Sequence, residues 1–120
     1  MLDIENRQIT LSDKTFGFID VTYIEALNYY IDYDEFGEKV SFLEISFLLD
    51  NGVDRSPLKL KFTEVTNLNL KGFGYSYNQI VGFDIVDTKD RGWVKEMRYH
   101  VTDYENSRID FYCAEITVIA

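Results

Sequence analysis

The sequence predicts an all-β fold, an antiparallel β-sandwich or barrel-like domain of about seven to nine short strands with at most one short helix. Two observations favour this class. Apolar and polar residues alternate over several segments that turn-forming residues separate. No segment combines a helical stripe of adequate length with helix caps. Of the two architectures we expect the sandwich, and nothing marks a second domain within residues 1–120.

The clearest strands of the first half begin at Val40. VSFLEISFLLD is rich in Phe, Ile and Leu and stops at Asn51-Gly52, a pair typical of hairpin turns. After the only proline, LKLKF alternates apolar and basic side chains. This alternation predicts a strand with one buried face and with Lys59 and Lys61 on the solvent face.

The next segments extend the same pattern. TNLNL continues the alternation until Gly72 and Gly74 interrupt it, and QIVGFDIVD is the next expected strand, before the turn-like TKDRG. Within that strand, Gly82 indicates a bulge or a close contact with another part of the chain.

The C-terminal segments WVKEMRYHV and RIDFYC predict the two strands of one hairpin. Each places its apolar residues on a single face. If the two apolar sets share a face, Val101 pairs with Phe111 and Tyr99 with Cys113. The loop then consists of residues 105–107.

The segment FGFIDVTYIEALNYYIDYDEFG is ambiguous. Ile24, Leu27 and Ile31 fit a helical stripe. The residues that fit strand alternation are Leu27, Tyr29, Ile31 and Tyr33. We favour strands, because Tyr and Ile prefer a pleated surface and no capping box brackets a helix. A short helix over residues 21–26 stays an alternative.

Charge limits the kinds of partner. The net charge is -9, and residues 1–54 hold twelve acids against three bases, whereas residues 55–120 hold nine of each. Such a field repels nucleic acid and anionic lipid and speeds encounter with a basic protein. We therefore expect a basic protein partner, no nucleic acid and no membrane, although solubility alone also accounts for the acids. With one Cys and no signal peptide or long apolar run, we expect a cytoplasmic protein.

We expect a binding protein with no catalytic residues, no metal and no cofactor. His100 is the only His, and the hairpin register puts it opposite Tyr112, on the other face of the sheet from Cys113. A zinc site needs more His or Cys ligands, and GFGYSYN lacks the remaining residues of a phosphate-binding loop. The alternatives are a sugar or apolar ligand bound by exposed aromatics, or a carboxylate-based hydrolase. The candidate aromatics are Tyr29, Tyr30, Tyr75, Tyr77 and Trp93.

The candidate binding site is the acidic segment DYDEFGE. Its residues are Asp32, Tyr33, Asp34, Glu35, Phe36 and Glu38. Solvated carboxylates steer a cationic partner, and a neighbouring aromatic supplies the desolvated anchor. A calcium loop is disfavoured, because Phe36 stands where an oxygen ligand belongs. The competing interpretation is that Phe36 packs onto the sheet and the acids only keep the hairpin from pairing with another molecule.

The C-terminal third carries a resemblance. IVGFDIVD, EMRYHVTDYENSRIDFYC and ITV resemble the C-terminal hairpins of small uncharacterised bacterial proteins that include immunity proteins of polymorphic toxin systems. The shared elements are Gly82-Phe83, an aromatic strand, Asp103 before a tight turn, and Phe111 with Cys113. The resemblance implies an immunity-type binding protein and assigns no functional residue.

Overall fold

The computed structural model describes residues 1–74, 77–89 and 94–119, and the all-β prediction is confirmed. The elements within these ranges include twelve strands and the short 3-10 helices η1 (Phe18–Asp20) and η3 (Lys95–Met97). The strands are β1 (Leu2–Asp3), β2 (Gln8–Leu11), β3 (Lys14–Gly17), β4 (Val21–Tyr33), β5 (Lys39–Asp50), β6 (Arg55–Thr63), β7 (Thr66–Leu70), β8 (Asn78–Gln79), β9 (Phe83–Asp87), β10 (Tyr99–Asp103), β11 (Ile109–Cys113) and β12 (Glu115–Val118). The number exceeds the expected range because several strands are only two to four residues long.

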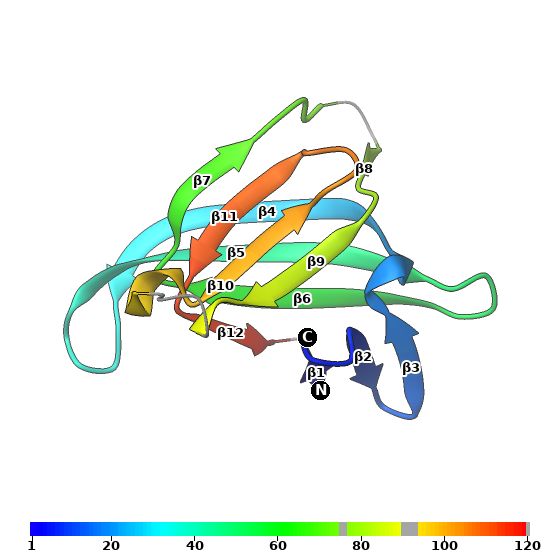
Figure 1. The fold of residues 1–120 in the computed structure, drawn as a ribbon, viewed down its shortest axis with the longest axis horizontal. Helices are drawn as coiled ribbons and strands as arrows, with labels where there is room; N and C mark the ends of the chain where they lie inside the picture. The colour runs from blue at the N-terminus through cyan, green and yellow to red at the C-terminus, as the bar shows by residue number, and fades with distance from the viewer. Residues whose placement is uncertain (75–76, 90–93, 120) are drawn as a thin grey trace.

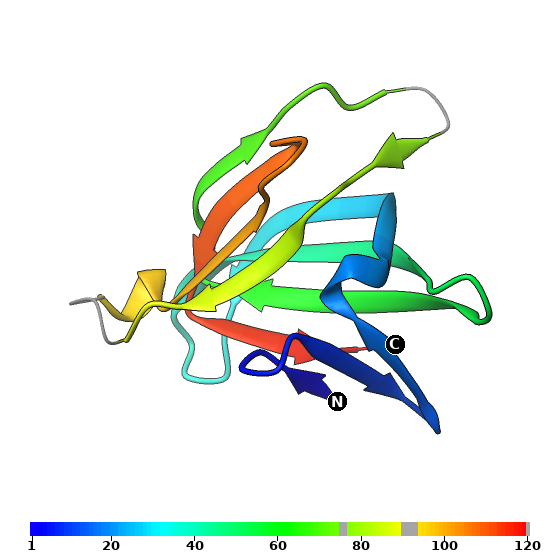
Figure 2. The same ribbon diagram turned by 45° about the vertical axis from the view of Figure 1, so that its right-hand side comes forward.

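The strands form three antiparallel sheets. The largest has the order β12-β6-β5-β4-β8, the second has the order β7-β11-β10-β9, and the N-terminal strands form a third, β1-β2-β3. Figure 1 shows the four-stranded sheet lying across one face of the five-stranded sheet. Figure 2 shows the N-terminal sheet beside this pair, on the side of β6 and β12, and its Ile9 and Phe16 belong to the same buried cluster. The arrangement is sandwich-like, as the sequence predicts.

The main core lies between the two larger sheets. Leu43, Leu60 and Phe62 of the five-stranded sheet and Val101 and Phe111 of the four-stranded sheet have no exposed surface. The Phe62 and Phe111 rings meet edge to face across the sheets, with their centroids 4.8 Å apart. This geometry is favourable for aromatic pairs beyond the area that they bury.

The middle strands follow the predicted alternation. Leu58, Leu60 and Phe62 of β6 are fully buried, while Lys59 and Lys61 point to the outer face. There the Lys59 Nζ lies 3.3 Å from a carboxylate oxygen of Glu44. The β5–β6 connection is the predicted turn, in which Gly52 has a φ of +88°.

The ambiguous segment is a strand, as favoured. β4 pairs with β5 along nearly its whole length, and two irregularities, between Val21 and Tyr23 and between Ile24 and Ala26, interrupt the register. Residues 21–26 are therefore not helical, and helical structure is confined to η1 just before them. Pairing with β5 buries Val21 and Ile24 in the core, which a short isolated helix would not achieve.

The C-terminal hairpin has the predicted register. Val101 pairs with Phe111 and Tyr99 with Cys113. The connection is longer than expected and covers residues 104–108. Asp103 shapes it, because its Oδ1 accepts hydrogen bonds from the backbone N–H groups of Arg108 at 2.8 Å and Ile109 at 2.9 Å.

The expected strand from residue 93 starts later than predicted. Residues 95–97 form η3, and β10 begins at Tyr99. The Thr88 hydroxyl donates to the carbonyls of Met97 at 2.7 Å and Arg98 at 3.0 Å, which stabilises a turn where alternation predicts an extended chain. Trp93 lies outside the described residues.

QIVGFDIVD is not one strand. Its first part belongs to β8, which pairs with β4, and its second part is β9, which pairs with β10. The chain therefore crosses between the two sheets at residues 80–82. Gly82 has a φ of +81° there, and a Cβ on it would lie 2.9 Å from ring atoms of Tyr104, so it marks a close contact.

Replacing Gly82 with Ala tests this contact. Gly52 is the matched control, because its φ is +88° and no other group lies within 4 Å of its added Cβ. Both changes introduce left-handed strain, and only Gly82→Ala also displaces Tyr104. We expect Gly82→Ala to lower the free energy of unfolding by about 1 kcal/mol more than Gly52→Ala does. Urea unfolding measures both variants, and equal losses would show that Tyr104 moves aside without cost.

Candidate functional site

The β4–β5 hairpin is longer than the sheet that covers it. β4 has 13 residues and β5 has 12, whereas β9, β10 and β11 have five each. β4 therefore has more than twice as many residues as each of these strands, and at a similar rise per residue it reaches well past them. In Figure 1 the hairpin extends beyond the four-stranded sheet at the left of the molecule. The outer half of its inner face therefore lacks a second layer.

This uncovered face carries an apolar row. Tyr29 pairs with Leu43 and Ile31 with Ser41, so these side chains share the face that carries the core. Leu43 has no exposed surface, but Tyr29 is 46% exposed, Ile31 56% and Tyr33 65%. A contiguous exposed apolar row of this kind is typical of an interaction surface.

The hairpin turns through residues 34–38. The Asp34 N–H donates to the Glu38 carbonyl at 2.8 Å, and Asp34 Oδ1 accepts from the N–H groups of Phe36 and Glu38, both at 2.9 Å. Gly37 takes a φ of +77°, which a residue with a Cβ rarely adopts. Asp34 therefore shapes the turn as well as adding charge to it.

The six predicted site residues lie together at this tip. Phe36 is 81% exposed, so the interpretation that it packs onto the sheet is wrong. The reason is the turn itself, because the backbone bonds to Asp34 hold residues 35–37 beyond the end of the strands. Two aromatic side chains, Tyr33 and Phe36, thus stand in solvent among four carboxylates. No base occurs anywhere in residues 15–38.

Tyr30, another predicted aromatic candidate, lies on the outer face of the sheet, where its ring and its hydroxyl both have partners within the protein. Its ring stacks on Phe42 with a centroid distance of 5.3 Å, and its hydroxyl donates to Glu44 at 2.5 Å. This hydrogen bond, together with partial burial and nearby carboxylates, raises the pKa of Tyr30 to about 12. Tyr77 is exposed, with its ring 5.8 Å from that of Tyr23, and Tyr75 lies outside the described residues.

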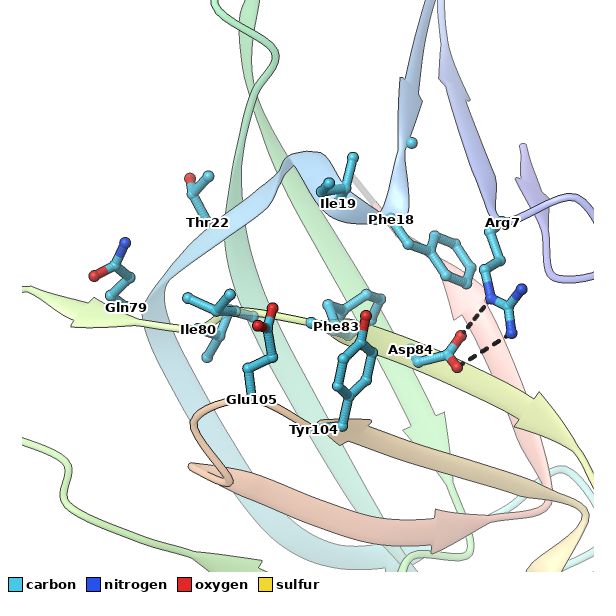
Figure 3. Close-up of a pocket in the computed structure, with 13 residues that line it drawn as sticks. Arg7, Phe18, Ile19, Thr22, Gln79, Ile80, Phe83, Asp84, Tyr104 and Glu105 are labelled. Carbon is cyan, nitrogen blue, oxygen red and sulfur yellow. Dashed lines mark hydrogen bonds and ion pairs between the residues drawn. The ribbon is translucent and has the colours of Figure 1, made fainter.

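A second feature is an open cleft of about 700 Å³ between η1, the β8–β9 crossover and the turn after β10 (Figure 3). Ile19 is 87% exposed at its rim, and Tyr104 is 65% exposed over Gly82. Arg7 and Asp84 form a two-pronged ion pair at one side, with Nε–Oδ1 at 2.9 Å and Nη2–Oδ2 at 3.4 Å. The cleft could not be predicted from the sequence because four distant segments line it, and the close contact expected at Gly82 was the only signal.

His100 and Cys113 lie on opposite faces, as the register predicts. His100 Nε2 is 2.7 Å from Asp110 Oδ1, and its ring stacks on Tyr112 with centroids 4.4 Å apart. Cys113 has no exposed surface, and burial raises the pKa of its thiol to about 12. The thiol therefore stays protonated at neutral pH. Within the described ranges, no group of three or more His, Cys, Asp or Glu side chains is arranged to hold a metal ion.

Comparison with known proteins gives no functional assignment, so a function is proposed from the fold and the candidate site. No family model matches the chain, and no match was found among curated proteins or solved structures. In the part of the chain that the structure describes, no helix has the length and apolar character needed to cross a membrane. The protein is a sandwich-like all-β protein whose longest hairpin carries an exposed acidic and aromatic tip.

Proposed function

We propose that this chain is a non-catalytic binding protein that recognises a cationic protein partner through the tip of the β4–β5 hairpin. One observation carries the proposal. Tyr33 and Phe36 are 65% and 81% exposed on a defined turn among four carboxylates, and Lys39, which pairs with Tyr33, is the one base next to them in sequence. A turn that serves solubility alone has no need of two exposed aromatic rings.

The tip combines two features of protein interfaces, charges that speed association and an aromatic side chain that can be buried in the complex. Asp32, Glu35 and Glu38 are exposed, so their charges stay solvated and accelerate encounter with a basic surface. Phe36 can enter a pocket on the partner at little entropic cost, because its ring has only two side-chain torsions. Buried aromatic anchors of this kind usually contribute most of the binding energy.

An immunity-type role is one form of this proposal. The resemblance of residues 80–118 to immunity proteins supports a partner of the toxin class, in which an acidic protein covers a basic functional surface. The hairpin tip lies outside the resembling segment. The partner's identity is therefore proposed from charge and chemistry, and the resemblance supports only its class.

A peptide library displayed on phage tests the proposal without a known partner. Peptides selected on the wild-type protein are measured against the variant Asp32→Asn/Glu35→Gln/Glu38→Gln, which keeps Asp34 because it shapes the turn. The matched control neutralises three exposed acids elsewhere: Glu5, Asp13 and Glu96. Both variants change the net charge from -9 to -6, since three negative charges are removed from each.

We expect the selected peptides to be rich in Lys and Arg and to include large apolar residues. Their association rate should fall by about tenfold on the tip variant and by less than about twofold on the control, because steering depends on local charge. The salt dependence should flatten only for the tip variant. Uncharged peptides, or equal effects of the two variants, would contradict the proposal.

The cleft supports a second candidate, binding of a sugar or small apolar ligand. The favouring observation is the exposed Tyr104 ring beside a volume of about 700 Å³ with polar groups at its edge. Asp84 lines the cleft but is engaged by Arg7, which favours ligand binding over carboxylate-based hydrolysis. Binding at the cleft would be sensitive to Tyr104→Ala and indifferent to the tip variant.

A further inference from the structure

The outer edge of β4 is paired over only a short distance. β8 pairs with β4 at Tyr23 and Ile24, and no other strand within the described ranges pairs with this edge. On its opposite side, β4 stays paired with β5 as far as Tyr33. Figure 1 shows β4 continuing along the rim of the sheet from β8 to the hairpin.

The register determines which backbone groups point out from this edge. In an antiparallel pair, every second residue exchanges both of its hydrogen bonds with the partner strand, and the residues between them point both groups away. The Asp34 N–H donates to the Glu38 carbonyl, in the same register that pairs Asp32 with Val40. Even-numbered residues therefore bond to β5. Tyr29, Ile31 and Tyr33 point their N–H and C=O groups outward, although the Tyr33 N–H already donates to Asp32 Oδ1 at 2.8 Å.

A second hydrogen bond gives the same parity. The Glu64 N–H donates to the Ser41 carbonyl at 2.8 Å, in register with the pairing of Leu43 and Phe62. Odd-numbered residues of β5 thus face β6, and its even-numbered residues face β4. Two independent hydrogen bonds, on the two sides of β5, therefore agree on which residues of β4 direct their N–H and C=O groups away from β5.

The two faces of this edge differ in chemistry. The side chains of Tyr29, Ile31 and Tyr33 form the exposed apolar row on the inner face. Asp32 is exposed on the outer face, and Asp34 and Glu35 follow at the turn. A strand laid along this edge would meet apolar side chains on one face and carboxylates on the other.

Lys, Pro and a bulge, which often protect edge strands, are missing from residues 27–33, where Asp32 is the only charged residue. Natural edges carry Lys, Pro or a bulge that prevents pairing with another chain. Residues 27–33 contain no Lys and no Pro, and both irregularities of β4 lie before Leu27. The edge is therefore open to an added strand.

We propose that an extended segment of the cationic partner adds as a strand to the β4 edge at residues 29–33, with apolar side chains on the inner face and basic side chains toward Asp32. The proposal rests on the proposed function and adds the mode of recognition and the alternating pattern of the bound segment. A second copy of this chain is disfavoured, because residues 15–38 hold six acids and no base, so two copies would bring like charges together.

A synthetic peptide in which Lys alternates with Val over about nine residues is the probe, since that length covers the free edge. Amide hydrogen exchange measured by NMR is the readout. At saturating peptide, exchange should slow by at least about tenfold at Tyr29 and Ile31, whereas Tyr33 is left out because its N–H already donates to Asp32. Asn28, Tyr30 and Asp32 are the internal control, because their N–H groups already bond to β5, and their exchange should change much less. A peptide in which Glu alternates with Val should not bind.

Two variants of Ile31 separate the contribution of its backbone N–H to peptide affinity from that of its side chain. Ile31→Pro removes an outward N–H and no bond to β5, a change that edge strands tolerate. Ile31→Thr removes the apolar side chain and keeps the N–H. Peptide affinity should fall by at least about tenfold for Ile31→Pro, and by less for Ile31→Thr. Should Ile31→Pro fail to fold, the exchange pattern in the wild-type protein decides the question alone.

The outcomes distinguish this proposal from the function on which it rests. A Lys–Val peptide that perturbs residues 34–38 without protecting the amides of Tyr29 and Ile31 overturns strand addition and leaves the tip as the binding site. Absence of binding by this peptide also overturns strand addition. The proposed function is then tested separately, by the association rates of the peptides selected on phage. Protection that rises with protein concentration, without peptide, would assign the edge to a second copy and overturn the proposal.

Discussion

Phe36→Ala is expected to weaken binding of the selected basic peptides by about 30-fold, which corresponds to roughly 2 kcal/mol. The Phe36 side chain is 81% exposed in the free protein and contributes little to the fold. In a complex it would be the largest apolar group at the tip. The free energy of unfolding should therefore change by less than about 0.5 kcal/mol.

Val53→Ala provides the matched control for Phe36. Val53 is 89% exposed and lies in the β5–β6 turn, in a different hairpin connection. Titration calorimetry of each variant, with urea unfolding of the same samples, separates lost affinity from lost stability. Unchanged affinity for Phe36→Ala would remove Phe36 as an anchor, and an equal loss for Val53→Ala would show that the assay reports nonspecific apolar contact.

Asp103→Ala is expected to lower the free energy of unfolding by about 2–5 kcal/mol, because it leaves two N–H groups without their acceptor. Asp103 is fully buried, and its Oδ1 accepts from Arg108 and Ile109. The Ile109 N–H is itself buried, so water cannot replace the lost bond there. The loss should therefore approach the full cost of stranding a buried polar group.

Asp103→Asn is the conservative comparison, because the amide keeps an oxygen acceptor for the same N–H groups. We expect its loss to be less than half of that of Asp103→Ala. Asp110→Ala controls for charge on the same hairpin, since Asp110 is exposed and should lose less than about 1 kcal/mol. Urea unfolding compares the three variants, and a small loss for Asp103→Ala would show that the turn forms without this carboxylate.

Much of the fold could be predicted because strand alternation is a local signal. In the C-terminal hairpin, the two apolar sets and the requirement that they share a face were enough to derive the pairs Val101–Phe111 and Tyr99–Cys113, which the structure confirms. The same reasoning separated His100 from Cys113. The acidic tip was also predictable as a hairpin turn, because Gly37 and the surrounding acids lie in one short segment.

The sequence could not place elements whose partners are remote. The 3-10 helix η3 replaces part of an expected strand because Thr88, nine residues before Met97 and outside that expected strand, donates to Met97 and Arg98. QIVGFDIVD was expected as one strand, but its two parts pair with different sheets. The cleft beside Tyr104 likewise required segments that only the folded chain brings together.

The sequence by itself determined the all-β class, the strand faces and the acidic character of the β4–β5 turn, because alternation, turn chemistry and charge are properties of neighbouring residues. Tertiary structure alone decided which apolar residues are buried. Leu43 and Tyr29 share one face and pair directly, yet only Leu43 is fully covered. The reason is geometric. β5 lies between β6 and β4, whereas β4 forms the rim of the sheet beyond its short pairing with β8. The opposing strands are also shorter than β4, so its core-facing row leaves Tyr29, Ile31 and Tyr33 exposed beside the backbone edge.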